Sequence, residues 1–103
     1  MARNSKAQRK RIENDLLNQL EEKWITGTHY VDLVQDYLAL WDVKNELIED
    51  IKTNGIKVVG MHGPKSNPSI NDLNKTNAQM LKILSDLGLK ASPEIKDDGD
   101  DDF

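Results

Sequence analysis

The segment GMHGPKS, residues 60–66, is the part of the chain that comes nearest to a phosphate-binding loop. Such a loop needs about four residues between its glycines and a Gly-Lys-Ser/Thr end, because successive backbone N–H groups must point at the phosphates. Here two residues separate Gly60 from Gly63, and Pro64 removes one of the required N–H donors. The segment therefore predicts a hairpin turn and not a nucleotide site.

The other residues with reactive side chains do not form a catalytic or metal-binding set. His29 lies three residues before Asp32 and His62 has no comparable neighbour, whereas a metal site needs about three or four ligands. The acidic C-terminal run lacks the closing Glu of a calcium loop. The chain has no cysteine, and no serine lies in the glycine-flanked elbow of a nucleophile. We expect no catalytic residue, no bound metal and no cofactor.

The charges are distributed unevenly along the chain of 103 residues, whose net charge is −4. Residues 1–11 hold five basic residues and no acidic one, and residues 93–103 hold six acidic residues and one lysine. A basic arm commonly binds nucleic acid, and an acidic tail commonly binds a protein partner or masks the arm. Alternatively, both ends are solvated and serve only solubility. We expect a flexible arm over residues 1–11 and a disordered tail over residues 93–103.

The composition limits the fold and the location of the protein. An apolar fraction of 37% with 31% charged residues suits a helical assembly better than a deep globular core. No run reaches the ~20 apolar residues of a membrane span, and the N-terminus has no apolar secretion signal. We therefore expect a cytoplasmic protein without membrane partners.

The longest amphipathic stretch, residues 30–53, predicts a central helix around which the rest of the domain is arranged. At helical spacing its apolar positions, Val43 excepted, fall within an arc of about 200°, with acidic residues on the opposite side. A helix that packs against one neighbour needs an apolar arc only somewhat above ~100°, so this helix has apolar surface for two. In so short a chain, we expect the second neighbour to be another copy of the protein.

Two further helices and a hairpin complete the predicted domain, residues 12–92, which is mainly α-helical. Residues 9–25 carry an apolar residue at every fourth position and predict a short first helix, with Gly27 as its C-cap and Thr28 as the next N-cap. The β-branched residues and glycines of residues 56–67 predict a β-hairpin. Asn67 and Pro68 begin a third helix over residues 68–87, antiparallel to the central one.

The third helix carries an apolar seam with one polar member, and it has a glycine at its end. Gly88 followed by Leu89 predicts a Schellman close. Asn77 lies in the seam, where a polar residue fixes register or oligomeric state; alternatively, the helix is slightly rotated and Asn77 is solvated. The aromatic residues of the first two helices have few basic neighbours, which favours packing in a core or subunit interface over base stacking.

The order of these signals resembles the small terminase subunit of tailed double-stranded-DNA bacteriophages. The resemblance covers residues 28–94. It rests on a helix bearing Tyr and Leu and on five short segments, namely Asn54-Gly55, Lys65-Ser66-Asn67-Pro68, Leu73-Asn74-Lys75, the close Leu84-Ser85-Asp86-Leu87-Gly88-Leu89, and Ser92-Pro93. This chain departs from longer members of the family in being short and in having an unusually acidic end.

The resemblance implies a non-catalytic subunit of the genome-packaging motor. Members of this family assemble into homo-oligomeric rings, recognise the packaging-initiation region of viral DNA, and deliver it to the large terminase subunit, which carries the ATPase and nuclease. The implied location is the cytoplasm of the infected host cell. Two alternatives remain: a small helical DNA-binding regulator, and a helical scaffold or adaptor without DNA affinity.

The expected contacts fall into three groups of residues. Repeated cations around a ring would bind DNA phosphates, so the predicted DNA-binding residues are Arg3, Lys6, Arg9, Lys10 and Arg11 of the arm, with Lys57 and Lys65 of the hairpin as second choices. The predicted oligomer interface comprises Tyr30, Val34, Tyr37, Trp41, Ile48, Ile70, Leu73, Asn77, Met80 and Leu84. The residues predicted to dock on the large subunit are Asp100, Asp101, Asp102 and Phe103.

The basic residues of the first helix also lie at the end that the helix dipole disfavours. Arg9, Lys10 and Arg11 in its first turn oppose the dipole at a cost of about a few tenths of a kcal/mol each. We therefore expect the start of the helix to fray unless an anion is bound there, which favours a functional role for these cations.

Overall fold

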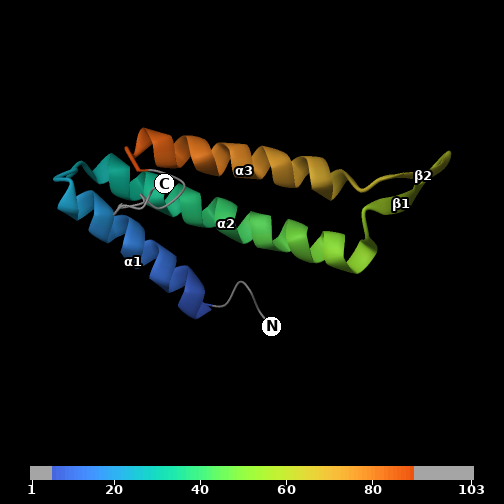
Figure 1. Ribbon diagram of the computed structural model, residues 1–103, viewed down its shortest axis with the longest axis horizontal. Coiled ribbons are helices and arrows are strands. Elements are labelled where there is room, and N and C mark those ends of the chain that lie inside the picture. Colours follow the sequence, from blue (N-terminus) through green and yellow to red (C-terminus); the bar gives the residue numbers. More distant parts are fainter. Residues whose placement is uncertain (1–5, 90–103) are drawn as a thin grey trace, which may run out of the picture.

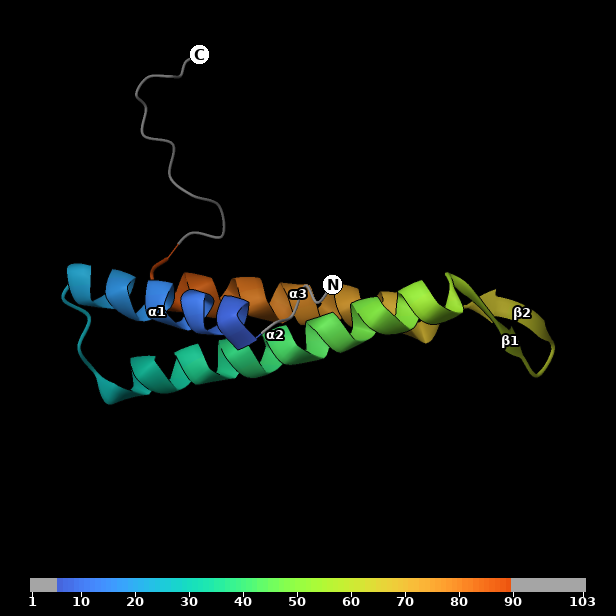
Figure 2. The same ribbon diagram turned by 90° about the horizontal axis from the view of Figure 1, so that it is seen from below.

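The computed structural model describes residues 6–89 of the protein. They form three helices and a hairpin: α1 (Lys6–Glu22), α2 (Thr28–Asn54), β1 (Lys57–Gly60), β2 (Gly63–Ser66) and α3 (Pro68–Asp86). Helices α2 and α3 run antiparallel side by side, α1 folds back along the N-terminal half of α2, and the hairpin projects beyond the opposite end (Figures 1 and 2). The predicted mainly helical fold with an antiparallel helix pair and a hairpin is confirmed.

The core lies at the end of the bundle where all three helices meet. It consists of leucines and one valine contributed by α1, α2 and the end of α3: Leu16, Leu20, Val34, Leu38, Leu84, Leu87 and Leu89. Val34 and Leu38 are fully buried because α1 and α3 cover two sides of α2. The two neighbours that the wide apolar arc of α2 requires are thus both helices of the same chain. Helix α1 covers a side of α2 that was expected to meet a second copy, and contact with a second copy stays a prediction.

The first helix begins earlier than its predicted start at Arg9. Lys6, Ala7 and Gln8 extend α1 by nearly a turn, so residues 6–11 are helical and do not belong to a flexible arm. Alanine, lysine and glutamine are good helix formers, and Arg9 is tied to α2 by an ion pair, which holds the first turn in place. Residues 1–5 lie outside the described part of the chain.

The end of the first helix also differs from the prediction. Trp24, and not Gly27, takes the left-handed conformation that closes α1, with φ of 61°. The Ile25 amide donates to the Leu20 carbonyl at 2.9 Å and the Trp24 amide to that of Glu21 at 3.1 Å, which is the Schellman pattern. Gly27 instead precedes α2 as its N-cap, without a side-chain cap from Thr28.

Gly27 lies close to the exposed ring of His29. A Cβ atom at this position would come within 2.6 Å of the His29 ring, which packs over the turn against Tyr30 with ring centroids 4.2 Å apart. At the other end of α2, Gly55 donates to the Ile51 carbonyl at 2.7 Å with φ of 85°. Its φ is positive as predicted, and its extended ψ of 178° directs the chain into the hairpin.

The third helix has the predicted signals at both ends. The Asn67 side chain accepts a hydrogen bond from the Ser69 amide at 2.9 Å, and Pro68 is the first helical residue. At the far end, Gly88 has φ of 78°, and the Leu89 amide donates to the Leu84 carbonyl at 2.8 Å. The N-cap and the Schellman close are therefore confirmed.

The buried polar residues between α2 and α3 are not those that the seam predicts. Asn45 and Thr76 are 2% and 7% exposed, whereas Asn77 is only half-buried. The Asn45 amide donates to the Trp41 carbonyl at 2.9 Å, and the Thr76 hydroxyl donates to the Asp72 carbonyl at 2.8 Å. Helix α3 is rotated relative to the predicted seam, so that Thr76 takes the buried position.

Candidate interaction surfaces

The first two turns of α1 gather several basic residues around a shallow hollow. Lys6, Arg9, Lys10 and Glu13 line this hollow, which has a volume of about 300 Å³. Lys6 and Lys10 are exposed, and Arg11 is exposed on the next position of the helix. Because the N-terminal end of a helix also carries partial positive charge, this end of α1 concentrates positive potential. We call Lys6, Arg9, Lys10 and Arg11 the basic turn.

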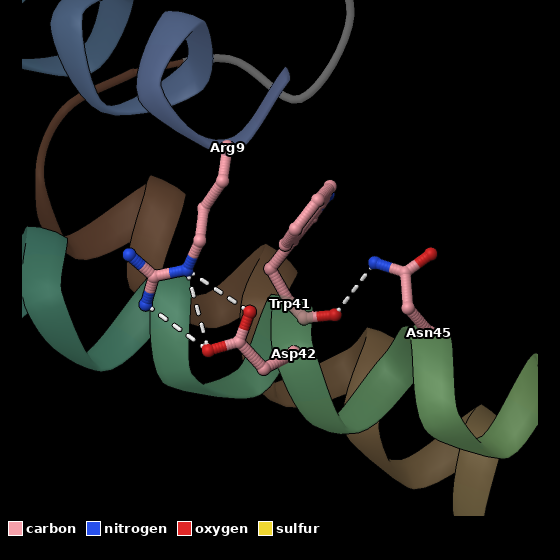
Figure 3. A network of polar contacts seen from close by, with 4 residues as sticks. All are labelled: Arg9, Trp41, Asp42 and Asn45. Carbon is pink, nitrogen blue, oxygen red and sulfur yellow. Dashed lines mark hydrogen bonds and ion pairs between the residues drawn. The ribbon is translucent and has the colours of Figure 1, made fainter. Parts of the chain in front are cut away.

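One member of the basic turn is fixed by an acidic partner on α2. The Arg9 Nε donates to Asp42 Oδ1 at 3.0 Å and the Nη2 donates to Oδ2 at 3.1 Å, in the two-pronged geometry of a guanidinium and a carboxylate (Figure 3). These hydrogen bonds raise the pKa of Arg9 above its ordinary value. The charge of Arg9 is thus compensated within the chain, while those of Lys6 and Arg11 have no ion-pair partner among residues 6–89.

A second contact between α1 and α2 lies beside this ion pair. Glu13 accepts a hydrogen bond from the Gln35 amide at 3.0 Å and one from the Lys10 ammonium at 3.4 Å. The hydrogen bond from Gln35 is the main reason why the pKa of Glu13 is below its ordinary value. Together with Arg9 and Asp42, this contact holds the start of α1 against the middle of α2.

The hairpin presents its two lysines on opposite faces. Lys57 pairs with Ser66 and Lys65 pairs with Val58 across the strands, and paired residues share a face, so the lysines lie on different faces. Lys65 also lies over Gly60, where a Cβ atom would come within 2.9 Å of its Cδ. The two lysines that the sequence suggested as DNA contacts therefore do not form one patch.

The base of the hairpin is held by a polar network that sequence reasoning missed. Asp50 accepts hydrogen bonds from the Ser69 hydroxyl at 2.7 Å, the Asn54 amide at 2.7 Å and the Asn67 amide at 3.1 Å. The Asn67 amide also donates to the Gly55 carbonyl at 2.9 Å. These bonds, that from Ser69 first, lower the pKa of Asp50. The sequence places Asp50 only on the solvent face of α2; the cap signal at Asn67 is the one clue to this network.

The residues predicted to form the oligomer interface divide into two sets. Four of them, Val34, Trp41, Met80 and Leu84, are at most 7% exposed within the single chain and are not surface residues. The reason is again that α1 and α3 both pack on α2. The other six are half-buried: Tyr30, Tyr37, Ile48, Ile70, Leu73 and Asn77.

Large apolar side chains are exposed at positions that are not among the ten predicted interface residues. Trp24, in the turn between α1 and α2, is 86% exposed. Val59 and Met61 are 91% and 92% exposed at the tip of the hairpin. A groove of about 450 Å³ between α2 and α3 is lined by Asp36, Ala39, Leu40, Gln79, Lys82, Ile83 and Asp86.

The residues that the sequence offered for metal binding or catalysis do not come together in the structure. His29 packs on Tyr30, and His62 is exposed at the turn of the hairpin. Within residues 6–89, no cluster of three or more histidine, aspartate or glutamate side chains could hold a metal ion. No helix in this part of the chain has the apolar length to cross a membrane. Arg3 and the predicted docking residues Asp100, Asp101, Asp102 and Phe103 lie outside the described residues.

The comparison with protein families identifies the class of protein that has this fold. A family model described as phage terminase, small subunit, matches residues 9–96. The chain belongs to this family. No curated protein and no solved structure matches the chain. Family membership indicates a role in phage DNA packaging, and small terminase subunits are generally non-catalytic.

Proposed function

We propose that this protein is the DNA-recognition subunit of a phage terminase, which binds the packaging-initiation region of viral DNA as a homo-oligomeric ring and delivers it to the large subunit. The observation that carries the DNA-binding part is the basic turn. Lys6, Arg9 and Lys10 surround one hollow at the N-terminal end of α1, where the helix dipole adds to their charge. Phosphate oxygens are the natural ligands of such a site.

The arrangement of charges on α1 supports contacts with the phosphate backbone of DNA more than readout of its bases. The exposed cations lie on one end of a helix whose remaining exposed residues are mainly acidic or amide side chains, so a single copy offers few contacts. A ring would repeat the basic turn and multiply these contacts, in which case affinity falls steeply with salt. Arg3, which precedes the described residues, is expected to add to the same site.

The DNA-binding proposal is tested by neutralising lysines inside and outside the basic turn. The variant Lys6→Gln/Lys10→Gln removes two cations of the hollow, and Lys52→Gln/Lys75→Gln removes two exposed cations from α2 and α3. Binding to a labelled duplex containing the packaging-initiation region is measured over a range of salt concentrations. We expect only the first variant to bind more weakly, with a salt slope smaller by about 0.9 for each phosphate that is no longer neutralised.

Two results would contradict this assignment. Equal losses in both variants would show that DNA binding is not localised at α1. An absence of binding by the unaltered protein even at low salt would favour a helical scaffold or adaptor.

We also propose that the acidic C-terminal residues Asp100, Asp101, Asp102 and Phe103 dock on a basic surface of the large subunit. The support is their composition: a run of carboxylates ending in one aromatic residue offers charge and a single apolar anchor. The cations of the basic turn are an alternative target for the same carboxylates.

A further inference from the structure

The turn between α1 and α2 holds a tryptophan in a conformation that tryptophan rarely adopts. Trp24 has φ of 61° at the position after the helix that glycine normally occupies. In this left-handed region the Cβ atom of an L-residue crowds the backbone, and a large side chain brings no local hydrogen bond in return. Folding of the single chain therefore does not explain the choice of tryptophan here.

The side chain of Trp24 also gains nothing from burial within the chain. It is 86% exposed, whereas the second tryptophan, Trp41, is 7% exposed. Tryptophan is among the residues that most often dominate protein interfaces, because it buries a large area and carries one N–H donor. A strained and exposed tryptophan is thus best explained by a contact outside the protomer.

The groove between α2 and α3 has the shape and chemistry to receive an indole ring. Its apolar lining comes from Ala39, Leu40 and Ile83, and its volume of about 450 Å³ exceeds that of one aromatic side chain. Asp36 and Gln79 also line the groove and provide acceptors for the indole N–H. Residues of α2 and α3 alone line the groove, so α1 of the same chain does not fill it.

Charge complementarity also favours contact between the turn that holds Trp24 and this groove. Lys23, adjacent to Trp24, is exposed, and its ammonium has no ion-pair partner among residues 6–89. Among the residues that line the groove, Asp86 is paired with Lys82 at 3.6 Å, whereas Asp36 has no such partner in the described chain. An incoming Trp24 can therefore bring a lysine toward an uncompensated aspartate.

We propose that Trp24 of one protomer inserts into the groove between α2 and α3 of the next protomer. The two surfaces lie at different places on the same chain, so the contact is head-to-tail, and such a contact forms a ring if the rotation closes. This inference rests on the proposed assembly of copies and not on DNA binding. It makes a residue outside the ten predicted interface residues the anchor of the subunit interface.

The test uses two variants that each remove one half of the contact. Trp24→Gly removes the anchor and relieves the left-handed strain, so the monomer should fold at least as well as the unaltered chain. Ala39→Arg places a long charged side chain in the groove at an exposed position, without altering the core. Val43→Ser removes a smaller exposed apolar side chain outside the groove and is the control.

Assembly is measured by mass photometry and light scattering without DNA over a concentration series. We expect both interface variants to need at least about tenfold higher concentration to assemble, whereas the control assembles like the unaltered protein. An equimolar mixture of the two variants should form a one-to-one pair and nothing larger, because the mixture retains one intact anchor and one intact groove.

The outcomes separate this inference from the proposed function. If the unaltered protein assembles and Trp24→Gly assembles with the same concentration dependence, the anchor is wrong while the ring remains. A loss of large-subunit binding with unchanged assembly would assign Trp24 to that partner and would also overturn the inference. If the unaltered protein stays monomeric at every concentration, with and without DNA, the proposed ring fails together with its anchor.

Discussion

The ion pair between Arg9 and Asp42 allows a prediction in which stability and DNA binding change in opposite directions. The substitution Asp42→Asn keeps the size of the side chain and removes the charge that holds Arg9. It should loosen the start of α1 and, at the same time, release a cation beside the hollow of the basic turn. The unfolding free energy should fall, and affinity for DNA should rise.

The stability change can be bounded from the geometry. Two unit charges about 4 Å apart attract by about 1 kcal/mol in water and about 4 kcal/mol in a medium of intermediate dielectric. The side chains of Arg9 and Asp42 are 36% and 47% exposed, so solvent screening places the pair near the lower value. Exposed ion pairs typically stabilise a protein by about 0.2–1 kcal/mol, and the two-pronged geometry of this pair favours the upper part of that range. We expect Asp42→Asn to cost about 0.5–1 kcal/mol.

Urea unfolding and a salt titration of DNA binding measure the two effects. The control is Asp32→Asn, which removes the same charge from an exposed position of α2 that has no ion-pair partner among the described residues. If Arg9 engages a phosphate once released, the salt slope of Asp42→Asn steepens by about 0.9 per contact and that of the control does not. An unchanged slope, or equal gains in both variants, would refute the placement of DNA at the basic turn.

Three further predictions concern the buried seam, the hairpin base and the acidic tail. Asn45→Leu should raise the unfolding free energy by about 1 kcal/mol in urea denaturation, since the Asn45 Oδ1 has no partner in the described chain; a decrease would contradict this prediction. The lowered pKa of Asp50 means that its contribution is complete above the ordinary carboxyl pKa of about 3.9 and is lost as pH falls through the folded value. The melting temperature of Asp50→Asn should therefore lie below that of the unaltered protein at neutral pH, and the gap should close in acid; a constant gap would count against the network. Deleting residues 95–103 should reduce capture of the large subunit in a pull-down, and full retention would exclude tail docking.

The elements of this fold were predictable because their signals are local. The end of α2 follows from Asn54-Gly55, and the bounds of α3 follow from Asn67-Pro68 and Gly88-Leu89, which are signals within a few residues of the structure they determine. The sequence left open whether α3 is rotated, and it could not decide that Thr76 is buried while Asn77 is half-buried, since both residues are polar neighbours. Only the packing of α3 against α2 decides between them.

The partners of α2 could not be read from its amphipathic pattern. The width of the apolar arc states how much surface must be covered but not which chain covers it, and α1 took the place expected for a second copy. The pairing of Arg9 with Asp42 joins residues 33 positions apart and leaves no sequence signature. The left-handed, exposed position of Trp24 was not predicted, because Gly27 nearby offered the usual residue for a helix close and the chain did not use it.

The central claim is that several copies assemble, so that the few cations of each chain together bind one duplex. Native mass spectrometry of the unaltered protein, alone and with a duplex containing the packaging-initiation region, tests this claim most directly. We expect a closed assembly of one defined copy number that retains this number when it binds a single duplex. Monomers that bind DNA one at a time, or a monomer that binds none, would contradict it.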